Sequence, residues 1–332
     1  MKIRKSQIYQ LEAPKELKVI DRELSIESGD QVLAESIYSA VSPGTELSAW
    51  VGKPPLRPGK IYPRVQGYCN LARVVSIGNQ VKNTKIGDWI LTHQSHRTKF
   101  CISESEILVS FDNLTDVEAK KVVNTYLYHL GYSSLLKAKF FPGHKVGIIG
   151  FGALGYTTAA LVAAFGGAPV LITSDPKRVS IFNDSCVSAL SKERARSNDE
   201  QDSFDIIINT SDSWDDYLIG LKLLRLGGVC VLLGFPGRGE HLPSFNPLDS
   251  RYLYDKQLNI KYAGHVCESD CLPIDVRFTL KRNMEYISDM ILSNRIETAA
   301  LDSYVENWTE LEQVYTHLNN RTVPSLGGIL KW

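Results

Sequence analysis

The sequence predicts an α/β protein of two domains, in which a β-rich N-terminal part precedes a doubly wound parallel sheet. Three observations support this prediction. Short β-rich runs separated by Gly, Pro and Asn fill roughly the first 120 residues, a pattern typical of a small barrel or sandwich. Strand-like and helix-like segments then alternate, as they do in parallel sheets covered by helices. A chain of 332 residues is also long enough for two domains.

The N-terminal strands and the helical segment after them define the first domain, residues 1–125. Behind a Thr-Asp start signal at Thr115, apolar residues recur at helical spacing. The strand-like runs of this domain are QVLAESIYSAVSPG, NLARVVSIGNQ, GDWILTH, TKFCIS and EILVSF.

The alternating segments define a second domain, residues 126–267, and a C-terminal segment, residues 268–332. KVGIIG, LGYTTAALVAAFG and PVLITS predict a strand, a helix and a second strand, which together form one βαβ unit. The segments FDIIINTS, DDYLIGLKLLRLGG and VCVLLGFPG continue the pattern. In the C-terminal segment, RFTLKRNMEYISDMILSNRI and WTELEQVYTHLNN predict helices, and GGILKW predicts a last strand.

Composition favours a cytoplasmic enzyme that acts on a small molecule. The 37 basic and 37 acidic residues balance, so no net charge attracts the chain to nucleic acid or anionic lipid. No apolar run is long enough for a membrane span, and the N-terminus lacks the apolar core of a signal peptide. The six cysteines have no paired CxxC spacing, which indicates reduced thiols.

A glycine-rich turn at the start of the second domain predicts a dinucleotide site. Gly150, Gly152 and Gly155 form G-x-G-x-x-G between a strand and a helix, with Ala153 and Leu154 in the turn. The first Gly permits the tight turn, the second lets the backbone approach a pyrophosphate, and the third lets helix and strand pack closely. The N–H groups at the helix start then face the phosphates.

The end of the next strand, from Thr173 to Arg178, decides between the two nicotinamide dinucleotides. If Ser174 ends the strand, a hydroxyl stands where NAD enzymes have a carboxylate, and Lys177 and Arg178 can neutralise the 2′-phosphate of NADP. If the register differs by one residue, Asp175 accepts from the ribose 2′-hydroxyl of NAD. We favour NADP and keep NAD as the alternative.

The order of these parts resembles the medium-chain dehydrogenase/reductase superfamily over nearly the whole chain. The segments that support the resemblance are VSPGTELSAWVG, PRVQGYCNLARVVSIGNQV, KIGDWI, the glycine turn, LRLGGVCVLLGFPG and RTVPSLGGILKW. The resemblance implies a GroES-like catalytic domain, to which the C-terminal segment returns, and a Rossmann cofactor domain. It also implies an active-site cleft between the domains and a homodimer formed through sheet edges. Near the ribose and the nicotinamide it places Asn209, Thr210, Gly234 and Phe235.

The chain lacks the zinc ligands of the alcohol dehydrogenases in this superfamily. Pro43 stands in place of the usual Cys, and Tyr68-Cys69 in place of a His-Glu pair. The four-cysteine zinc lobe is also missing. We therefore expect a zinc-free member, similar to the branch described as bacteriochlorophyllide dehydrogenase-like.

Two other groups of possible zinc ligands are weak. His93, His96 and Cys101 are short-spaced, but zinc needs three or four converging ligands. We interpret the two histidines as surface residues. Cys267 and Cys271 are interpreted as an incidental pair.

Without a metal, hydrogen-bond donors must stabilise the charge that grows on a carbonyl oxygen. Tyr68 is the first candidate, and Thr45 and Glu46 lie on the corresponding loop. Tyr126 falls within one residue of the third zinc-ligand position, and His129 is a possible proton shuttle. Three of them have a structural alternative: packing for Tyr68, a turn or cap for Thr45, and a satisfied helical histidine for His129.

These observations favour an NADPH-dependent, zinc-independent reductase of a ketone or aldehyde. Three alternatives remain open. One is an enone reductase. Another is an NAD(P)-dependent dehydrogenase that oxidises a secondary alcohol of a sugar or cyclitol, for which Glu46, Asn70 and His93 would suit a polyhydroxylated substrate. The third is a nucleotide-sensing protein without turnover. Trp50 and Tyr62 are candidates for the substrate pocket, with a core role as the alternative.

Overall fold

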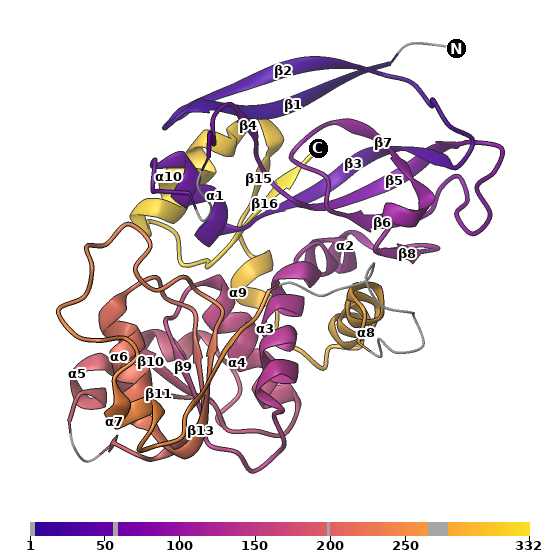
Figure 1. The fold of residues 1–332 in the computed structure, drawn as a ribbon. Coiled ribbons are helices and arrows are strands. Elements are labelled where there is room, and N and C mark those ends of the chain that lie inside the picture. The colour runs from indigo at the N-terminus through magenta and orange to yellow at the C-terminus, as the bar shows by residue number, and fades with distance from the viewer. Residues whose placement is uncertain (1–3, 56–58, 198–199, 265–277) are drawn as a thin grey trace. The chain divides into compact units, whose positions relative to one another are not determined.

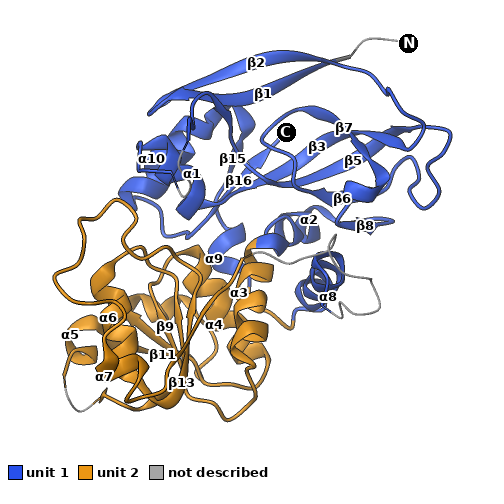
Figure 2. Cartoon of the chain, in the orientation of Figure 1, with its two compact units in different colours: residues 1–126, 273–294, 298–332 blue, residues 127–272, 295–297 orange. Residues whose placement is uncertain are grey.

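The computed structural model describes residues 4–55, 59–197, 200–264 and 278–332. The chain forms two compact units (Figure 2). Unit 1 takes in residues 1–126, 273–294 and 298–332, and unit 2 takes in residues 127–272 and 295–297. Cys267 and Cys271 lie outside the described residues. In the described part of the chain, no helix is both long and apolar enough to cross a bilayer.

Unit 1 is built on two β-sheets (Figure 1). The smaller has the order β2-β1-β4, and the larger has the order β15-β16-β3-β5-β6-β8, with β7 also paired to β3. Apolar side chains that alternate along β3 and β5 are buried in the core of the larger sheet. The strands are β1 (Arg4–Ala13), β2 (Glu16–Leu24), β3 (Gln31–Val41), β4 (Arg64–Val65), β5 (Cys69–Ile77), β6 (Trp89–Thr92), β7 (Lys99–Ser103), β8 (Val109–Phe111), β15 (Val305–Asn307) and β16 (Gly328–Lys331).

The helices of unit 1 include one at the predicted start signal. Thr115 caps α2 (Asp116–Val122) in a capping box with Glu118. The predicted helical segment is divided, because a second helix, α3 (Thr125–Ala138), begins after a break at residues 123–124. From Leu127 onward α3 belongs to unit 2. Among the described residues, the other helices of unit 1 are α1 (Pro43–Trp50), α8 (Leu280–Leu292), α9 (Ala299–Asp302) and α10 (Leu311–Asn320).

Unit 2 is a Rossmann domain. Its described residues form six parallel strands in the order β11-β10-β9-β12-β13-β14. The chain thus starts in the middle of the sheet, runs to one edge and then returns beside β9. This topology confirms the predicted doubly wound sheet, and the mixed sheets of unit 1 fit the predicted GroES-like domain. The strands are β9 (Val146–Ile149), β10 (Val170–Thr173), β11 (Ser188–Ser191), β12 (Phe204–Asn209), β13 (Leu224–Leu232) and β14 (Asn259–Tyr262).

Two helices of unit 2 follow strands that form the nucleotide end of the sheet. The first is α4 (Ala153–Ala164), which follows β9 and is buried on nearly all sides among small residues. The second is α6 (Trp214–Leu223), which follows β12. The predicted helix over DDYLIGLKLLRLGG is too long, because β13 already begins at Leu224. Leucines continue from the helix into the strand, at Leu223 and Leu224, so hydrophobicity does not mark the boundary.

Candidate active site

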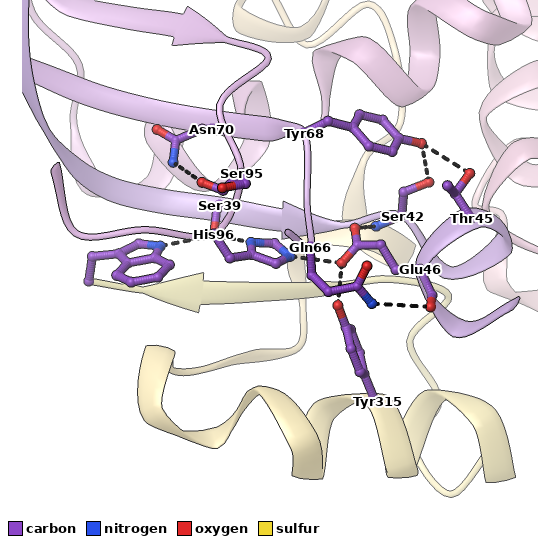
Figure 3. Close-up of polar contacts among 11 residues, drawn as sticks. Ser39, Ser42, Thr45, Glu46, Gln66, Tyr68, Asn70, Ser95, His96 and Tyr315 are labelled. Carbon is purple, nitrogen blue, oxygen red and sulfur yellow. Dashed lines mark hydrogen bonds and ion pairs between the residues drawn. The ribbon is translucent and has the colours of Figure 1, made fainter. Parts of the chain in front are cut away.

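Three hydroxyl groups of unit 1 lie together (Figure 3). Tyr68 precedes β5, Ser42 is the N-cap of α1, and Thr45 lies in the first turn of α1. The phenol of Tyr68 donates to Oγ of Ser42 and lies 3.5 Å from Oγ1 of Thr45. The strand start and the helix start thus bring the predicted Tyr68 and Thr45 together, with Ser42 as an additional member.

Two rings extend this hydroxyl cluster. Tyr126, at the start of α3, meets the ring of Tyr68 edge-on with centroids 5.6 Å apart. The imidazole of His93 meets Tyr126 in the same manner at 4.5 Å, and its Nδ1 lies 3.2 Å from the Tyr68 carbonyl oxygen. Tyr68, Thr45 and Tyr126 are half-buried and His93 is exposed, so the cluster has a face that a small molecule can reach.

Burial keeps the two phenols and the imidazole of the cluster in their neutral forms. Burial raises the pKa of Tyr68 above its ordinary range and that of Tyr126 to about 12. Partial desolvation lowers the pKa of His93, which keeps its imidazole neutral at neutral pH. Both phenols therefore carry their protons at neutral pH and can act as hydrogen-bond donors.

Glu46 does not join this cluster, although it follows Thr45 directly. Successive helical residues point about 100° apart, and the Glu46 side chain turns into the unit, where it is 1% exposed. There it contacts His96, which is also fully buried. The interpretation of His96 as a surface residue is therefore wrong, because the sequence does not reveal the buried carboxylate that pairs with it.

The other predicted residues have different surroundings. Asn70 is fully buried and donates to Ser36, so of the residues suggested for a polyol pocket only His93 is exposed. Trp50 lies in an apolar core, and the Tyr62 hydroxyl donates to the Ala49 carbonyl. His129 is fully buried within α3, and its role as a shuttle stays a prediction.

The resemblance to the zinc alcohol dehydrogenases implies positions for zinc ligands, and the side chains at these positions do not suit zinc. They are Pro43, the protonated phenols of Tyr68 and Tyr126, and Cys69, a buried thiol whose pKa burial raises. Zinc binds thiolates, imidazoles and carboxylates. His93 and His96 are directed to different partners, the Tyr68 carbonyl and Glu46.

The glycine turn of unit 2 has the geometry that a dinucleotide requires. Gly150 has a φ of +96°, which favours glycine. A Cβ at Gly155 would lie 2.1 Å from the Gly150 carbonyl oxygen, whereas a Cβ at Gly152 would meet nothing within 4 Å. Gly152 caps α4 without a side-chain hydrogen bond. The turn is closed on its protein side and open where a pyrophosphate would approach the helix.

The strand β10 ends at Thr173, and Ser174 and Asp175 follow it as exposed residues. The Asp175 N–H donates to Oγ1 of Thr173 at 3.3 Å. Arg178 folds back toward the glycine turn, with its guanidinium 5.3 Å from the ring centroid of Phe151 and Nη1 3.5 Å from the Phe151 carbonyl oxygen. Lys177 is exposed nearby in the chain. A positive charge therefore lies against the turn.

The ends of β12 and β13 border the same turn. Thr210 donates to the Ile149 carbonyl at 2.9 Å, and a Cβ at Gly234 would lie 2.4 Å from the Ser211 carbonyl oxygen. Asn209 is fully buried, and its Nδ2 has no partner. A buried amide group without an acceptor is costly, so this group fits a ligand. Phe235, directly after Gly234 in the chain, is 40% exposed. These residues fit a bound dinucleotide.

Comparisons with known proteins agree with this architecture. No family model matches the chain. NADP-dependent alcohol dehydrogenase C 1 of Mycolicibacterium smegmatis is 28% identical over 192 residues, which cover 56% of this chain and 52% of that protein. Mannitol dehydrogenase of Apium graveolens is 23% identical over 309 residues, covering 80% of this chain and 82% of that protein.

Solved structures show the same fold over the whole chain. L-idonate 5-dehydrogenase from Escherichia coli matches with a TM-score of 0.80 at 14% identity, covering 100% of this chain and 99% of that one. The homologues and structural neighbours are members of the medium-chain, zinc-type alcohol dehydrogenase superfamily. The match to the mycobacterial relative spans about half of that protein's length.

Proposed function

We propose that this chain is an NADPH-dependent, zinc-independent oxidoreductase that reduces a ketone or aldehyde of a small or medium organic substrate. The observation that carries the proposal is the Tyr68 phenol. The resemblance implies that it takes the place of a zinc ligand, and it is half-buried, protonated and hydrogen-bonded to Ser42. A positioned donor can do the electrostatic work that a metal does elsewhere.

The side chains of the cluster have distinct roles in this proposal. The reduced nicotinamide, when bound, supplies a hydride to the carbonyl carbon. The Tyr68 phenol donates a hydrogen bond and then its proton to the carbonyl oxygen, which becomes an alcohol. The hydroxyls of Ser42 and Thr45 then donate to the phenolate that remains. Tyr126 and His93 supply a neutral wall beside the substrate.

NADP is the favoured cofactor because of the charge at the end of β10. Ser174 follows the strand, and Arg178 lies against the glycine turn. A guanidinium binds a phosphate through charge-assisted hydrogen bonds. The mycobacterial relative is described as NADP-dependent. NAD stays the alternative, because Asp175 directly follows Ser174 and its carboxylate could accept from the ribose 2′-hydroxyl of NAD.

Oxidation of a polyol, the activity in the name of the mannitol dehydrogenase relative, receives less support from the side chains. Glu46 and Asn70, two of the polar residues that would bind hydroxyl groups, are buried and hydrogen-bonded within unit 1. Reduction of an enone would use the same Tyr68 donor, and only the choice of substrate distinguishes it.

The first test is fluorescence titration of the purified protein with NADPH and NADH, with metal content measured on the same sample. We expect tighter binding of NADPH and no stoichiometric zinc, followed by NADPH oxidation with members of a panel of ketones, aldehydes and enones. Stoichiometric zinc would contradict the metal-free chemistry. Binding of NADPH without turnover of any panel member would favour a nucleotide-sensing protein.

A further inference from the structure

A buried carboxylate beneath the hydroxyl cluster is hydrogen-bonded to the start of its own helix α1, to the segment between β6 and β7, and to α10 (Figure 3). Oε1 of Glu46 accepts from the Ser42 N–H at 2.7 Å, and Oε2 accepts from the Tyr315 hydroxyl at 2.6 Å and lies 2.8 Å from Nε2 of His96. All three side chains, Glu46, His96 and Tyr315, are at most 1% exposed. Burial of so many polar groups is costly unless each is paired.

The hydrogen-bond inventory assigns a direction to this network. The indole N–H of Trp332 can only donate, and it donates to Oγ of Ser39 at 2.8 Å. The Ser39 hydroxyl can then donate to Nδ1 of His96, which lies 2.7 Å away. With a proton on Nε2, His96 then donates to Oε2 of Glu46, so every member of the chain has a partner.

The network holds the partner of the Tyr68 phenol. An N-cap serine ordinarily uses its hydroxyl to accept from an N–H of the first helical turn, but Ser42 makes no such bond. The backbone N–H of Ser42 instead donates to the carboxylate of Glu46, which holds the main chain of Ser42 in place. The Ser42 hydroxyl is thereby left to face the phenol of Tyr68.

The network also holds the main chain that carries the phenol. Gly67, with a φ of +87°, lies against the His96 ring, where a Cβ would come within 2.7 Å of the imidazole. The backbone N–H of His96 donates to the backbone carbonyl of Gln66 at 2.8 Å. Residues 66 and 67 are thus fixed on His96 immediately before Tyr68.

We propose that Glu46, His96 and Tyr315 are positioning residues that hold the Tyr68 phenol and the Ser42 hydroxyl in one geometry. The inference rests on the proposed function, because it assigns Tyr68 as the proton donor. It also gives Glu46 a role different from direct contact with substrate. Displacement of a reacting group by about 1 Å can reduce a rate about a hundredfold.

Tyr315→Phe tests this inference with a mild change, because it removes one donor to Glu46 and keeps the ring in the core. Tyr38→Phe is the matched control: Tyr38 is also a buried tyrosine of unit 1, and its hydroxyl also donates to a carboxylate, that of Asp116. Glu46→Gln is the second test variant. Thermal unfolding of all three identifies any variant that fails to fold.

The first readout needs no substrate. The protein is labelled with 3-fluorotyrosine, and the ¹⁹F resonance of position 68 is assigned with Tyr68→Phe. We expect Tyr315→Phe and Glu46→Gln to shift or broaden this resonance, and Tyr38→Phe to leave it unchanged. An unchanged resonance in folded Tyr315→Phe and Glu46→Gln would overturn the inference.

The second readout is kinetic. Tyr315→Phe is expected to lower kcat for carbonyl reduction about tenfold with KM nearly unchanged, because a misplaced donor weakens the transition state more than substrate binding. An equal loss in Tyr38→Phe would show a merely structural effect and overturn the inference. Failure of the proposed function looks different: the wild type reduces no carbonyl, while the ¹⁹F shifts still report the positioning.

Discussion

At the scale of single residues, the phenol of Tyr68 is the group on which the proposed chemistry depends. We expect Tyr68→Phe to lower kcat for carbonyl reduction at least about a hundredfold, the usual contribution of a positioned general acid. NADPH affinity should change little, because the nucleotide residues belong to unit 2. Tyr9→Phe is the control, since the Tyr9 hydroxyl donates to the Trp308 carbonyl outside the cluster. Turnover by Tyr68→Phe at the wild-type rate would remove this phenol from the mechanism.

The pH dependence of the reaction follows from the same phenol. Tyr68 must be protonated to donate, and burial raises its pKa above the ordinary range, so the competent form persists to higher pH than for an exposed tyrosine. We therefore expect kcat to be level from about pH 6 to about pH 9 and to fall only above about pH 10. Stopped-flow measurement of NADPH oxidation gives this profile. A decline centred near pH 7 would assign the essential proton to another group.

Arg178 is the residue that tests the choice of dinucleotide. We expect Arg178→Ala to weaken NADPH binding by about tenfold to a hundredfold, the value of charge-assisted hydrogen bonds to a phosphate, and to leave NADH binding nearly unchanged. Arg251→Ala is the control, because Arg251 is an exposed arginine of the same unit. Weaker NADH binding in Asp175→Ser, with NADPH binding unaffected by Arg178→Ala, would establish NAD as the cofactor.

At the scale of elements, substitution of two glycines in the turn between β9 and α4 should have opposite effects on stability and on NADPH binding. A Cβ at Gly155 would collide with backbone, whereas one at Gly152 enters open space. Gly155→Ala should therefore lower the free energy of unfolding by about 1–3 kcal/mol, as overpacking does. Gly152→Ala should keep the wild-type Tm and lose NADPH binding, because the new methyl group lies where the pyrophosphate approaches. Calorimetry with fluorescence titration measures both. Full NADPH affinity in Gly152→Ala would contradict this placement.

The sequence is informative about elements because local signals define them. The Thr115 capping box, the apolar strand β9 and the glycines after it are all recognisable within a few residues of sequence. The boundary at Leu224 is not recognisable in the sequence, because leucines continue from the end of the helix into the start of the strand. The burial of Glu46 could not be predicted from its neighbours, since its partner Tyr315 lies 269 positions along the chain.

The candidate site shows the same division between local and distant information. Tyr68, Thr45 and Tyr126 were singled out by their places in a family pattern, and the structure brings these three side chains together. The sequence does not indicate Ser42 as a member of the site, and it indicates the wrong environment for His96, which is fully buried. A serine before Pro-Gly is typical of a helix start, but nothing nearby shows that its hydroxyl faces a phenol. His96 stands beside Arg97 and Lys99 in a polar segment, which indicates a surface position.

At the scale of the whole molecule, the edge of the Rossmann sheet leads to a prediction about assembly. Among the described strands, β14 ends the sheet with β13 on its inner side, and Tyr262 on β14 is 63% exposed. An edge strand has N–H and C=O groups that can pair with a second chain. We therefore predict a homodimer, with two copies of β14 close to a two-fold axis.

Light scattering with size-exclusion chromatography tests this assembly. The mass should be twice that of the 37.1 kDa chain. Tyr262→Glu places two like charges near each other across the axis and should shift the protein toward monomer at micromolar concentration, most strongly at low salt, because salt screens the repulsion. Tyr254→Glu is the control, because Tyr254 is also exposed but follows α7 (Ser250–Leu253) and lies off the strand. A monomeric wild type, or equal dissociation of both variants, would exclude the β14 edge as the dimer interface.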